Sequence, residues 1–536
     1  MCRKYLYTLS LAGGIMAGLP WNGVPGVLLF VVFIPLFIIV EKYSRGLKEG
    51  AFSLFPYGFI FFAAWNATAV WWLPVIDLIG GLTVILLNVT LMSLVFTLFV
   101  FTRQTAGERS GYASFVIFWL AYEYILLWGD LSWPWLHLGN GFAGNIKLVQ
   151  WYEHTGVAGG SLWVLLVNVM LFSLWRRSTA GGYLRGCIVQ ACLLLSVIVI
   201  PVIVSYNIFS RYNGNSDDNI NVFLLQPNLD PYTEKFDELS LRGRVKDLTG
   251  LAEDMPGPPP DYVIAPETAV DSVWLQEENI HLNPLKNYLG ENPQTSFILG
   301  ATLFEEVSCQ KEDHTVRFDP DRGICFRVYN SSLHLDFEHG MGVYNKKQLV
   351  PGVENIPFHR YITLPGFLSV DLGGVTGIYA RGEEPAAFQH HEKEVSAGQL
   401  ICFESLYGRL AGGTVMEGAG FIAVITNDGW FKGTNAYLQH LRQSQLRAIE
   451  TRRPIARSAN TGVSAIINSR GEITAHGRWM ERTVVEGYVT PRGELTFYVL
   501  NGDYLGRTAF FFSILIILSV ALKQYLLKQK RPSSFR

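Results

Sequence analysis

The chain has 536 residues, of which 49% are hydrophobic, 13% aromatic and only 16% charged. Soluble domains usually carry about 25% charged residues, so this composition favours a membrane protein with room for two or three domains. The formal net charge of −2 gives no electrostatic reason to expect a nucleic-acid partner.

Long apolar runs in the first 210 residues and near the carboxyl end predict membrane spans. A bilayer core about 30 Å thick needs about 20 mostly apolar residues per helix. We place seven spans before residue 210 and an eighth after the polar region, at 5–21, 25–40, 52–73, 78–102, 111–129, 159–175, 186–206 and 508–522. No small-residue cleavage site follows the first run, so we interpret it as a retained span.

The lysines and arginines of the short loops predict the orientation of these spans. They precede the first span and follow the second, fourth, sixth and eighth: Arg3, Lys4, Lys42, Arg45, Lys48, Arg103, Arg109, Arg176, Arg177, Arg185, Lys523, Lys528, Lys530, Arg531 and Arg536. The alternate loops, near 74–77 and 130–158, contain only Lys147. By the positive-inside rule, both termini are expected in the cytoplasm and the long segment between spans seven and eight outside it.

Two polar residues fall inside predicted spans, Asn66 and Glu123. A carboxylate in a membrane is a functional candidate, but a hydrogen bond between helices explains either residue more simply. The loop at 132–135 carries aromatic side chains suited to the membrane interface, where they could anchor the protein or contact a lipid.

From residue 220 onward, short runs rich in β-branched and aromatic residues predict buried strands at 221–226, 262–265, 296–300, 332–335, 400–403 and 421–426. The segment 436–453 is rich in helix formers and predicts a helix. This mixture favours a layered α/β domain. We therefore divide the chain into a seven-helix membrane region at 1–206, an extramembrane domain at 207–505, and an eighth span with a short tail at 506–536.

Three residues with compatible chemistry fall where a predicted strand gives way to a loop: Glu267, Lys346 and Cys402. A thiol needs a base to become a nucleophile, and an ammonium beside a reacting carbonyl stabilises the oxyanion that forms. Each residue alone is weak evidence. A lone cysteine in an apolar run is more often a packing residue, and a lone charged residue is usually a solvated surface group.

The six cysteines include no Cys-x-x-Cys pair, and His137, His154, His440 and His476 show no ligand spacing. We therefore expect no metal and no organic cofactor. Cys309 and Cys325 flank a polar stretch and could form a disulfide in an oxidising compartment, a question that sequence separation leaves open.

Ordered motifs connect the three candidate residues to a known family. They are 224–228 (LLQPN), 265–268 (APET), 329–331 (YNS), 344–351 (YNKKQLVP), 402–404 (CFE), 426–431 (TNDGWF) and 457–462 (RSANTG), with 133–139 (WPWLHLG) in the membrane half. In this order they resemble the nitrilase, or carbon–nitrogen hydrolase, superfamily. With spans on both sides, nearly the whole chain resembles the apolipoprotein N-acyltransferase family. The resemblance implies an αββα sandwich of the nitrilase type between spans seven and eight.

The resemblance also implies an acyl transfer in two steps, with Glu267 as base, Cys402 as nucleophile and Lys346 as oxyanion stabiliser. A fatty acyl chain would pass from a membrane phospholipid to a Cys402 thioester, and then to the α-amine of a diacylglyceryl-cysteine on an apolipoprotein. The expected location is the bacterial inner membrane, with the catalytic domain in the periplasm. A monomer is the simplest state.

Further candidates for supporting the triad or positioning substrate are Asn330, Glu354, Phe403, Glu404 and Trp430. Glu354 could equally be a structural carboxylate, and core packing explains an aromatic residue such as Trp430 more simply. The chain departs from the family pattern at Phe403, where a tyrosine is usual, at Phe236, where a tryptophan is frequent, and at the segment 351–354. Glycines and charges at 352–390 suggest loops that act as a lid.

Two rival functions use the same residues differently. A membrane-tethered amidase would act on a small amide with the same triad, but a tether needs one helix, whereas eight spans are predicted. A transporter with an inactive outer domain should show internal symmetry or paired broken helices, and the sequence shows neither.

Overall fold

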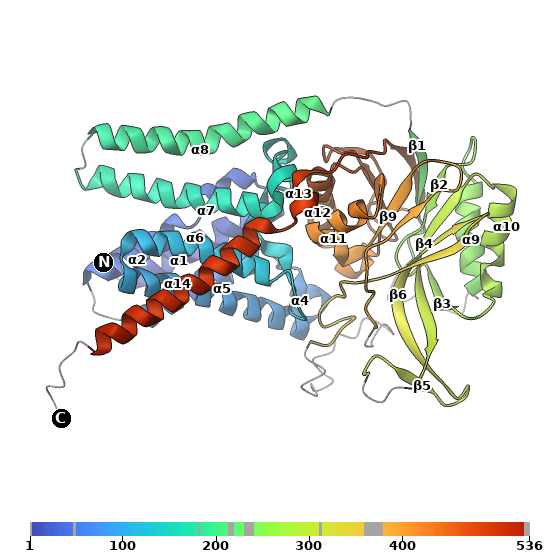
Figure 1. Cartoon of the computed structure of the whole chain (residues 1–536), viewed down its shortest axis with the longest axis horizontal. Coiled ribbons are helices and arrows are strands. Elements are labelled where there is room, and N and C mark those ends of the chain that lie inside the picture. The colour runs from blue at the N-terminus through green and yellow to red at the C-terminus, as the bar shows by residue number, and fades with distance from the viewer. Residues whose placement is uncertain are drawn as a thin grey trace. The chain divides into compact units, whose positions relative to one another are not determined.

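The computed structural model describes residues 3–46, 50–181, 184–212, 219–229, 241–309, 313–357 and 379–529 (Figure 1). The chain divides into two compact units. The first joins Met1–Ile208 to Asp503–Arg536, and the second is Phe209–Gly502. The departure from the family pattern at Phe236 lies outside the described residues.

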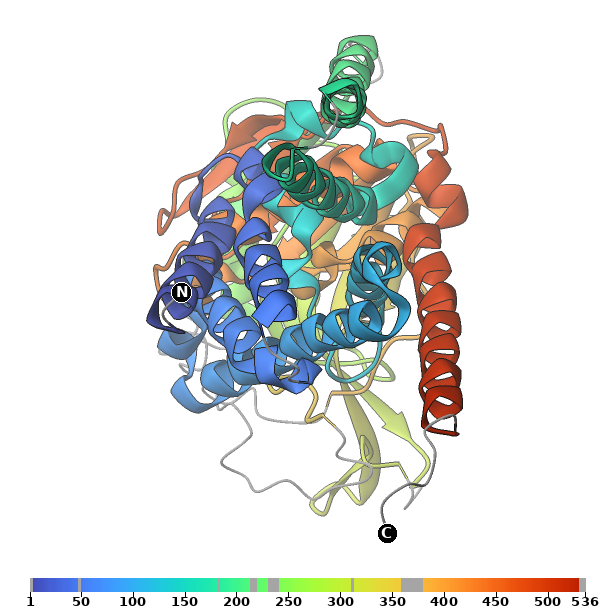
Figure 2. The ribbon, with the colours of Figure 1, turned by 90° about the vertical axis from the view of Figure 1, so that its left-hand side faces the viewer.

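The first unit is helical, as predicted. Its helices are α1 (Arg3–Gly18), α2 (Ile34–Gly46), α3 (Phe55–Ala69), α4 (Leu73–Ile76), α5 (Leu78–Ala106), α6 (Glu108–Ile125), α7 (Tyr152–Thr179), α8 (Leu184–Arg211) and α14 (Tyr504–Gln529). Helix α1 packs on α3, α3 on α5, and α14 returns from the far end of the sequence to pack on α6 (Figure 2).

Five helical segments of the described chain are long and apolar enough to cross a membrane: Gly26–Tyr43, Leu78–Ala106, Tyr152–Thr179, Leu184–Arg211 and Tyr504–Leu527. The predicted count of eight spans therefore stays a prediction, because α1 and α3 have only 16 and 15 residues. The predicted continuous spans at 25–40 and 52–73 are interrupted. The first divides into a 3₁₀ turn (Gly26–Val31) and α2, and the second into a 3₁₀ turn (Ala51–Leu54) and α3, which ends at Ala69 before α4 begins at Leu73. In the second case Pro74 stands in the first turn of a new helix, where its missing N–H costs nothing.

Hydrogen bonds hold the side chains of Asn66 and Glu123 in place within the helical unit. Asn88 Nδ2 on α5 donates to Asn66 Oδ1 on α3 at 2.8 Å, which is the predicted hydrogen bond between helices. Glu123 Oε1 accepts from Trp119 Nε1 at 3.0 Å and from the backbone N–H of Leu138 at 2.8 Å. Asn66 thus makes the predicted hydrogen bond between helices, whereas Glu123 bonds to a residue of its own helix and to the backbone that follows it.

The aromatic loop at 132–135 is partly a packing element. Trp135 is buried, and its ring lies 5.0 Å from that of Trp72 and 5.6 Å from that of Trp133. For Trp135, the packing interpretation therefore accounts for the side chain.

The second unit contains two β-sheets. Their strands are β1 (Ile220–Gln226), β2 (Tyr262–Ile264), β3 (Val270–Trp274), β4 (Ser296–Val307), β5 (Arg317–Asp319), β6 (Ile324–Asp336), β7 (Gly340–Asn345), β8 (Ala387–Gln389), β9 (Ser396–Ile401), β10 (Phe421–Thr426), β11 (Ile455–Ala459), β12 (Ala465–Ile467), β13 (Ile473–His476) and β14 (Thr483–Val489). The first sheet has the order β14-β1-β2-β4-β6-β5, with β3 beside β4 and β7 beside β6. The second has the order β13-β12-β11-β10-β9-β8.

Helices cover the outer face of each sheet, so the unit is the expected αββα sandwich. Helices α9 (Leu241–Glu253) and α10 (Asn283–Glu291) share a core with Phe223 and Leu225 of β1. The alternate residues Val222 and Leu224 point the other way, into the core between the sheets. Helices α11 (Gly408–Met416) and α12 (Ala436–Thr451) pack on the second sheet, and the short helix α13 (Phe497–Asn501) lies beside them.

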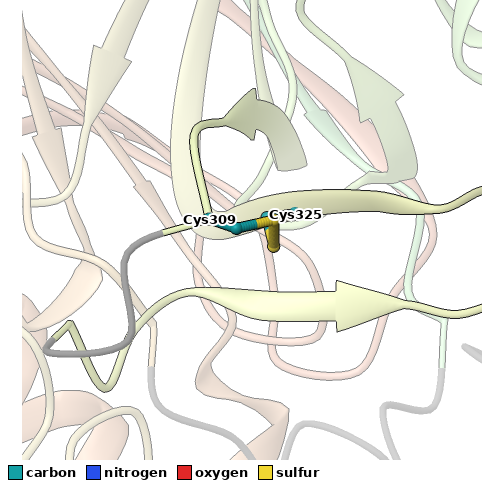
Figure 3. Close-up of a disulfide and its surroundings, with 2 residues drawn as sticks. All are labelled: Cys309 and Cys325. Carbon is teal, nitrogen blue, oxygen red and sulfur yellow. A yellow bond between two sulfur atoms is a disulfide. The ribbon is translucent and has the colours of Figure 1, made fainter.

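A disulfide joins Cys309 to Cys325, which settles a pairing that the sequence left open (Figure 3). Cys325 lies in β6, and Cys309 follows β4, the antiparallel neighbour of β6. The bond closes the end of this strand pair, where β5 also pairs with β6.

Candidate active site

The candidate residues gather at one edge of the sandwich. Strands β9, β10 and β11 run parallel, so their carboxyl ends meet at the same edge of the second sheet. Cys402 follows β9, and the pair Asn427 and Asp428 follows β10. In the first sheet, Glu267 comes shortly after β2 and Lys346 directly after β7.

Cys402 stands at a sharp turn and not within a strand. The predicted strand 400–403 is wrong at its end, because β9 stops at Ile401 and a 3₁₀ turn spans Cys402–Leu406. The φ angle of Cys402 is +49°, in the left-handed region that a residue with a Cβ rarely adopts. Such a conformation costs about 1–3 kcal/mol and persists only where its surroundings enforce it.

Lys346 lies between two carboxylates in a buried cluster. Its Nζ is 2.9 Å from Glu267 Oε1 and 2.9 Å from Glu354 Oε1. Asn330 Nδ2 donates to the same two oxygens, at 2.8 and 2.7 Å. All four residues are at most 6% exposed. Two carboxylates and one ammonium give the cluster a charge of about −1, which Asn330 spreads by hydrogen bonding.

The charges of this cluster set the resting state of the cysteine. Burial raises the pKa of the Cys402 thiol and the Glu267 charge raises it further, whereas Lys346 lowers it. For Lys346 itself, burial lowers the pKa, but the charges of Glu267 and Glu354 outweigh this and hold it well above its ordinary value. The thiol is therefore protonated at neutral pH, and the lysine is charged.

Among the described residues, Glu404 makes no hydrogen bond to the lysine side chain that the sequence suggested it could position, although the Lys346 charge lowers its pKa. It is fully buried and accepts from the backbone N–H groups of Lys347 and Gln348 at 2.7 and 3.0 Å. It also accepts from the N–H of Ile401 at 2.9 Å and from the Tyr344 hydroxyl. The carboxylate thus ties the segment after Lys346 to the residue before Cys402. Its burial raises its pKa, against these donors.

Phe403 and Trp430 lie in the turns that follow β9 and β10. Phe403 is 5% exposed and packs edge-on against Tyr407, with ring centres 5.5 Å apart. Trp430 lies partly buried in the turn Asp428–Phe431 after β10. Glu267 and Asn427 help to line a small recess of about 20 Å³. Most of the suggested lid, residues 358–378, lies outside the described residues.

A second buried cluster behind the cysteine was not predicted. Asp428 bonds to Arg457 Nη2 at 2.7 Å and to His440 Nδ1 at 3.0 Å, and His440 Nε2 lies 3.1 Å from the Cys402 carbonyl oxygen. The motifs at 426–431 and 457–462 contain Asp428 and Arg457, but the sequence indicated no role for either residue. His440 was considered only as a metal ligand, for which it lacks the spacing. A charged residue inside the apolar run 455–459 was the one available indication.

Two family models match this chain. A carbon–nitrogen hydrolase model matches residues 315–492, and a model of the apolipoprotein N-acyltransferase N-terminal domain matches residues 13–170. The apolipoprotein N-acyltransferase of Chlorobaculum tepidum is 26% identical, covering 93% of each chain. That of Thermotoga maritima is 26% identical, covering 96% of this chain and 92% of its own. Among solved structures, Saccharomyces cerevisiae Nit3, a nitrilase superfamily member, is 16% identical with a TM-score of 0.35, covering 53% of this chain and 93% of its own.

The sandwich and its buried Glu–Lys–Cys edge therefore define a carbon–nitrogen hydrolase domain, carried by a multi-pass membrane protein. The helical region preceding it matches its own family model, and the two matched ranges together cover more than half of the sequence. The chain belongs to the apolipoprotein N-acyltransferase family. The hydrolase match includes Lys346 and Cys402 but begins after Glu267, whose place in the site is supported by its contact with Lys346.

Proposed function

We propose that this protein transfers a fatty acyl chain from a membrane phospholipid, through a thioester on Cys402, to the N-terminal α-amine of a diacylglyceryl-cysteine on apolipoproteins. The observation that supports this reaction type is the Lys346 ammonium held between Glu267 and Glu354 in electrostatic contact with the Cys402 thiol. Membership of the N-acyltransferase family supports the lipoprotein acceptor.

In the first step Glu267 takes the thiol proton, and Cys402 Sγ attacks the carbonyl carbon of the acyl ester. Moving a proton from Cys402 to Glu267 leaves the total charge of the buried cluster unchanged, so the transfer avoids the cost of adding a charge to a desolvated site. The ester C–O bond then breaks, and Glu267 returns the proton to the departing lysophospholipid oxygen. An acyl thioester remains on Cys402.

Lys346 is suited to hold the tetrahedral oxyanion. An ammonium has three N–H donors, and among the described residues two of them face Glu267 and Glu354. The third can point at the developing negative charge, which is where a fixed donor contributes most to catalysis. The two carboxylates keep the lysine charged and in place before any substrate arrives.

In the second step the α-amine of the lipoprotein attacks the thioester carbonyl. The C–S bond breaks, an amide forms, the amine proton passes to Glu267, and Cys402 recovers its proton. Water would hydrolyse the same thioester, so the site must favour the amine. Membrane helices that precede and follow the catalytic domain in the sequence fit substrates that are themselves lipids. Each CH₂ group drawn into water would cost about 0.8 kcal/mol, which makes extraction of a whole acyl chain expensive.

We further propose that the protein acts as a monomer in the bacterial inner membrane, with both termini cytoplasmic and the catalytic unit periplasmic. The arginines and lysines of alternate loops support this orientation. The Cys309–Cys325 disulfide supports it independently, because such bonds persist in oxidising compartments and are rare in the cytosol.

Intact mass spectrometry of the full-length protein tests the proposal. The protein is incubated with phospholipid alone in mixed micelles, and then with a diacylated lipopeptide that has a free α-amine. We expect one acyl adduct after the first incubation and its loss, with N-acylation of the peptide, after the second. Cys402→Ala, which removes only the nucleophile, should show neither.

The result that would refute the proposal is the absence of an adduct in folded protein whose Cys402 reacts with a thiol reagent. If a small amide acylates Cys402 while phospholipid does not, the protein is a membrane-bound amidase. If the thioester forms but passes only to water, the acceptor part of the proposal fails.

A further inference from the structure

The carbonyl group of Cys402 is held from behind by two side chains. Ser405 Oγ donates to this oxygen at 2.8 Å, and His440 Nε2 lies 3.1 Å from it and 2.9 Å from Ser405 Oγ. Ser405 is fully buried, and His440 is 1% exposed. The three groups are therefore within direct hydrogen-bond distance of one another.

His440 is itself fixed at its other nitrogen. Its Nδ1 lies 3.0 Å from Asp428 Oδ1, and Arg457 Nη2 donates to Asp428 Oδ2 at 2.7 Å. Burial raises the pKa of Asp428, but Arg457 and His440 outweigh this and lower it to about 2, so the carboxylate is ionised and can only accept. Thr426 Oγ1 adds a further donor at 3.1 Å.

Asp428 is fully buried and closely packed. A Cβ atom at Gly462 would lie 2.4 Å from Asp428 Oδ2 and 2.7 Å from its Cβ, so a glycine is required beside it. Arg457 is completely buried in β11, and its Nη1 also donates to the backbone carbonyl of Val463 at 2.9 Å. Strands β10 and β11 and helix α12 thus place the imidazole as one rigid group.

We infer that Asp428, His440 and Arg457 are positioning residues that hold the Cys402 carbonyl, and so the nucleophile, in its reactive orientation. The peptide bond is planar, so fixing the carbonyl of Cys402 also fixes the plane that it shares with the N–H of Phe403. Cys402 adopts a φ of +49°, and a cysteine would leave that conformation unless the flanking peptides were held. This inference rests on the proposed role of Cys402 as nucleophile.

The test compares His440→Leu, His440→Gln and Ser405→Ala in the full-length protein. Gln445→Ala is the matched control, because Gln445 lies on the same helix and donates to a backbone carbonyl, that of Gly471, which has no part in the site. The probe is p-nitrophenyl acetate, whose burst of p-nitrophenolate reports acylation of Cys402 whatever the natural acyl donor is. Rates are normalised to folded protein, measured by size-exclusion chromatography and thermal unfolding.

We expect the burst rate to fall on the order of 10²-fold in His440→Leu, the loss that a small misplacement of a reacting group causes. His440→Gln should recover part of the rate, since its amide can still reach the carbonyl. Ser405→Ala removes one hydrogen bond and should lower the rate about five-fold. The KM for the ester should not change in any variant, because none of these side chains is proposed to contact substrate, and Gln445→Ala should match the wild type.

Burst rates within twofold of the wild type in folded His440→Leu and Ser405→Ala would overturn the inference and leave the cluster a purely structural one. If His440→Leu does not fold, the Ser405→Ala and His440→Gln rates decide the question. A wild-type burst with the ester but no adduct with phospholipid would refute the proposed donor and leave this inference standing.

Discussion

Replacing Lys346 by methionine should destabilise the protein more than any comparable change at its surface. Methionine keeps most of the length of the side chain but removes the charge that lies 2.9 Å from both Glu267 Oε1 and Glu354 Oε1. The two oxygens, at most twice that distance apart, would then face each other across a buried site with only Asn330 between them. Removing one partner of a buried pair costs about 3–5 kcal/mol.

The neighbouring residue supplies the control. Lys347 Nζ lies 3.8 Å from Glu384 Oε2, but Glu384 is 85% exposed, and exposed pairs contribute about 0–1 kcal/mol. Lys347→Met should therefore leave stability almost unchanged. In the double variant Lys346→Met, Glu354→Gln the like-charge repulsion disappears, so part of the loss should be recovered and the two effects should not add.

Thermal unfolding of the full-length protein in detergent, followed by intrinsic fluorescence, measures these differences. A loss of 3–5 kcal/mol corresponds to a Tm lower by about 10 °C for a domain of this size. The pKa of Lys346 is raised, so its contribution is fully present below its ordinary value and is lost only as pH rises through the folded value. The wild-type Tm should thus show no titration of Lys346 between pH 6 and about 9. A loss below about 1 kcal/mol for Lys346→Met, or additive effects in the double variant, would refute the reasoning.

Three further changes test other parts of the site. Burial and the Glu267 charge raise the pKa of Cys402. In Glu267→Gln, alkylation of Cys402 by iodoacetamide should therefore begin at lower pH, while acyl-enzyme formation at pH 7 falls about 10²–10⁴-fold. A parallel loss of alkylation and acyl-enzyme formation would argue against Glu267 as base. The pKa of Asp428 is lowered to about 2, so its contribution to stability is present above the ordinary carboxyl pKa and is lost as pH falls through 2. Asp428→Asn should therefore lose about 2 kcal/mol of acid-sensitive stability, measured by unfolding from pH 5 to 2. In Gly300→Ala the new Cβ would lie 2.5 Å from Glu267 Cα. We therefore expect a loss of about 1–3 kcal/mol of stability in thermal unfolding, together with slower acyl-enzyme formation. Wild-type values for both measurements would contradict this packing.

The strands that the sequence predicted well are the short apolar runs. The predicted strand 421–426 coincides with β10, and 221–226 differs from β1 by one residue, because every residue of β10 and all but one of β1 is buried. Strands β13 and β14 escaped notice because β13 has no buried residue and β14 has only two, so neither forms a buried apolar run. Strand β11 contains Arg457, which a reader of the sequence alone would place in a loop. Its charge is tolerated only because Asp428 lies opposite in space.

The triad itself was selected by ordered motifs, and its supporting contacts could not have been derived from them. Nothing in the spacing of Asn330 and Glu354 shows that one amide donates to both carboxylates. His440 was judged by the spacing of metal ligands, yet its partners lie 12 and 38 residues away along the chain. Long-range polar contacts of this kind become visible only when the sheets are assembled.

The turn at Cys402 is held by hydrogen bonds both before and after the cysteine, which explains how it keeps a strained backbone. Before the cysteine, Glu404 accepts the N–H of Ile401 and the N–H groups that follow Lys346. After it, Ser405 and His440 hold the carbonyl. Both anchors are buried polar groups that tie the nucleophile to other elements, the first to the segment after β7 and the second to α12. The energy stored in the turn is therefore offset by contacts that also tie it to the segment after Lys346 and to α12. In the proposed mechanism, relaxing either anchor would relieve the backbone and, by the same movement, displace the Cys402 thiol from its place beside Glu267 and Lys346.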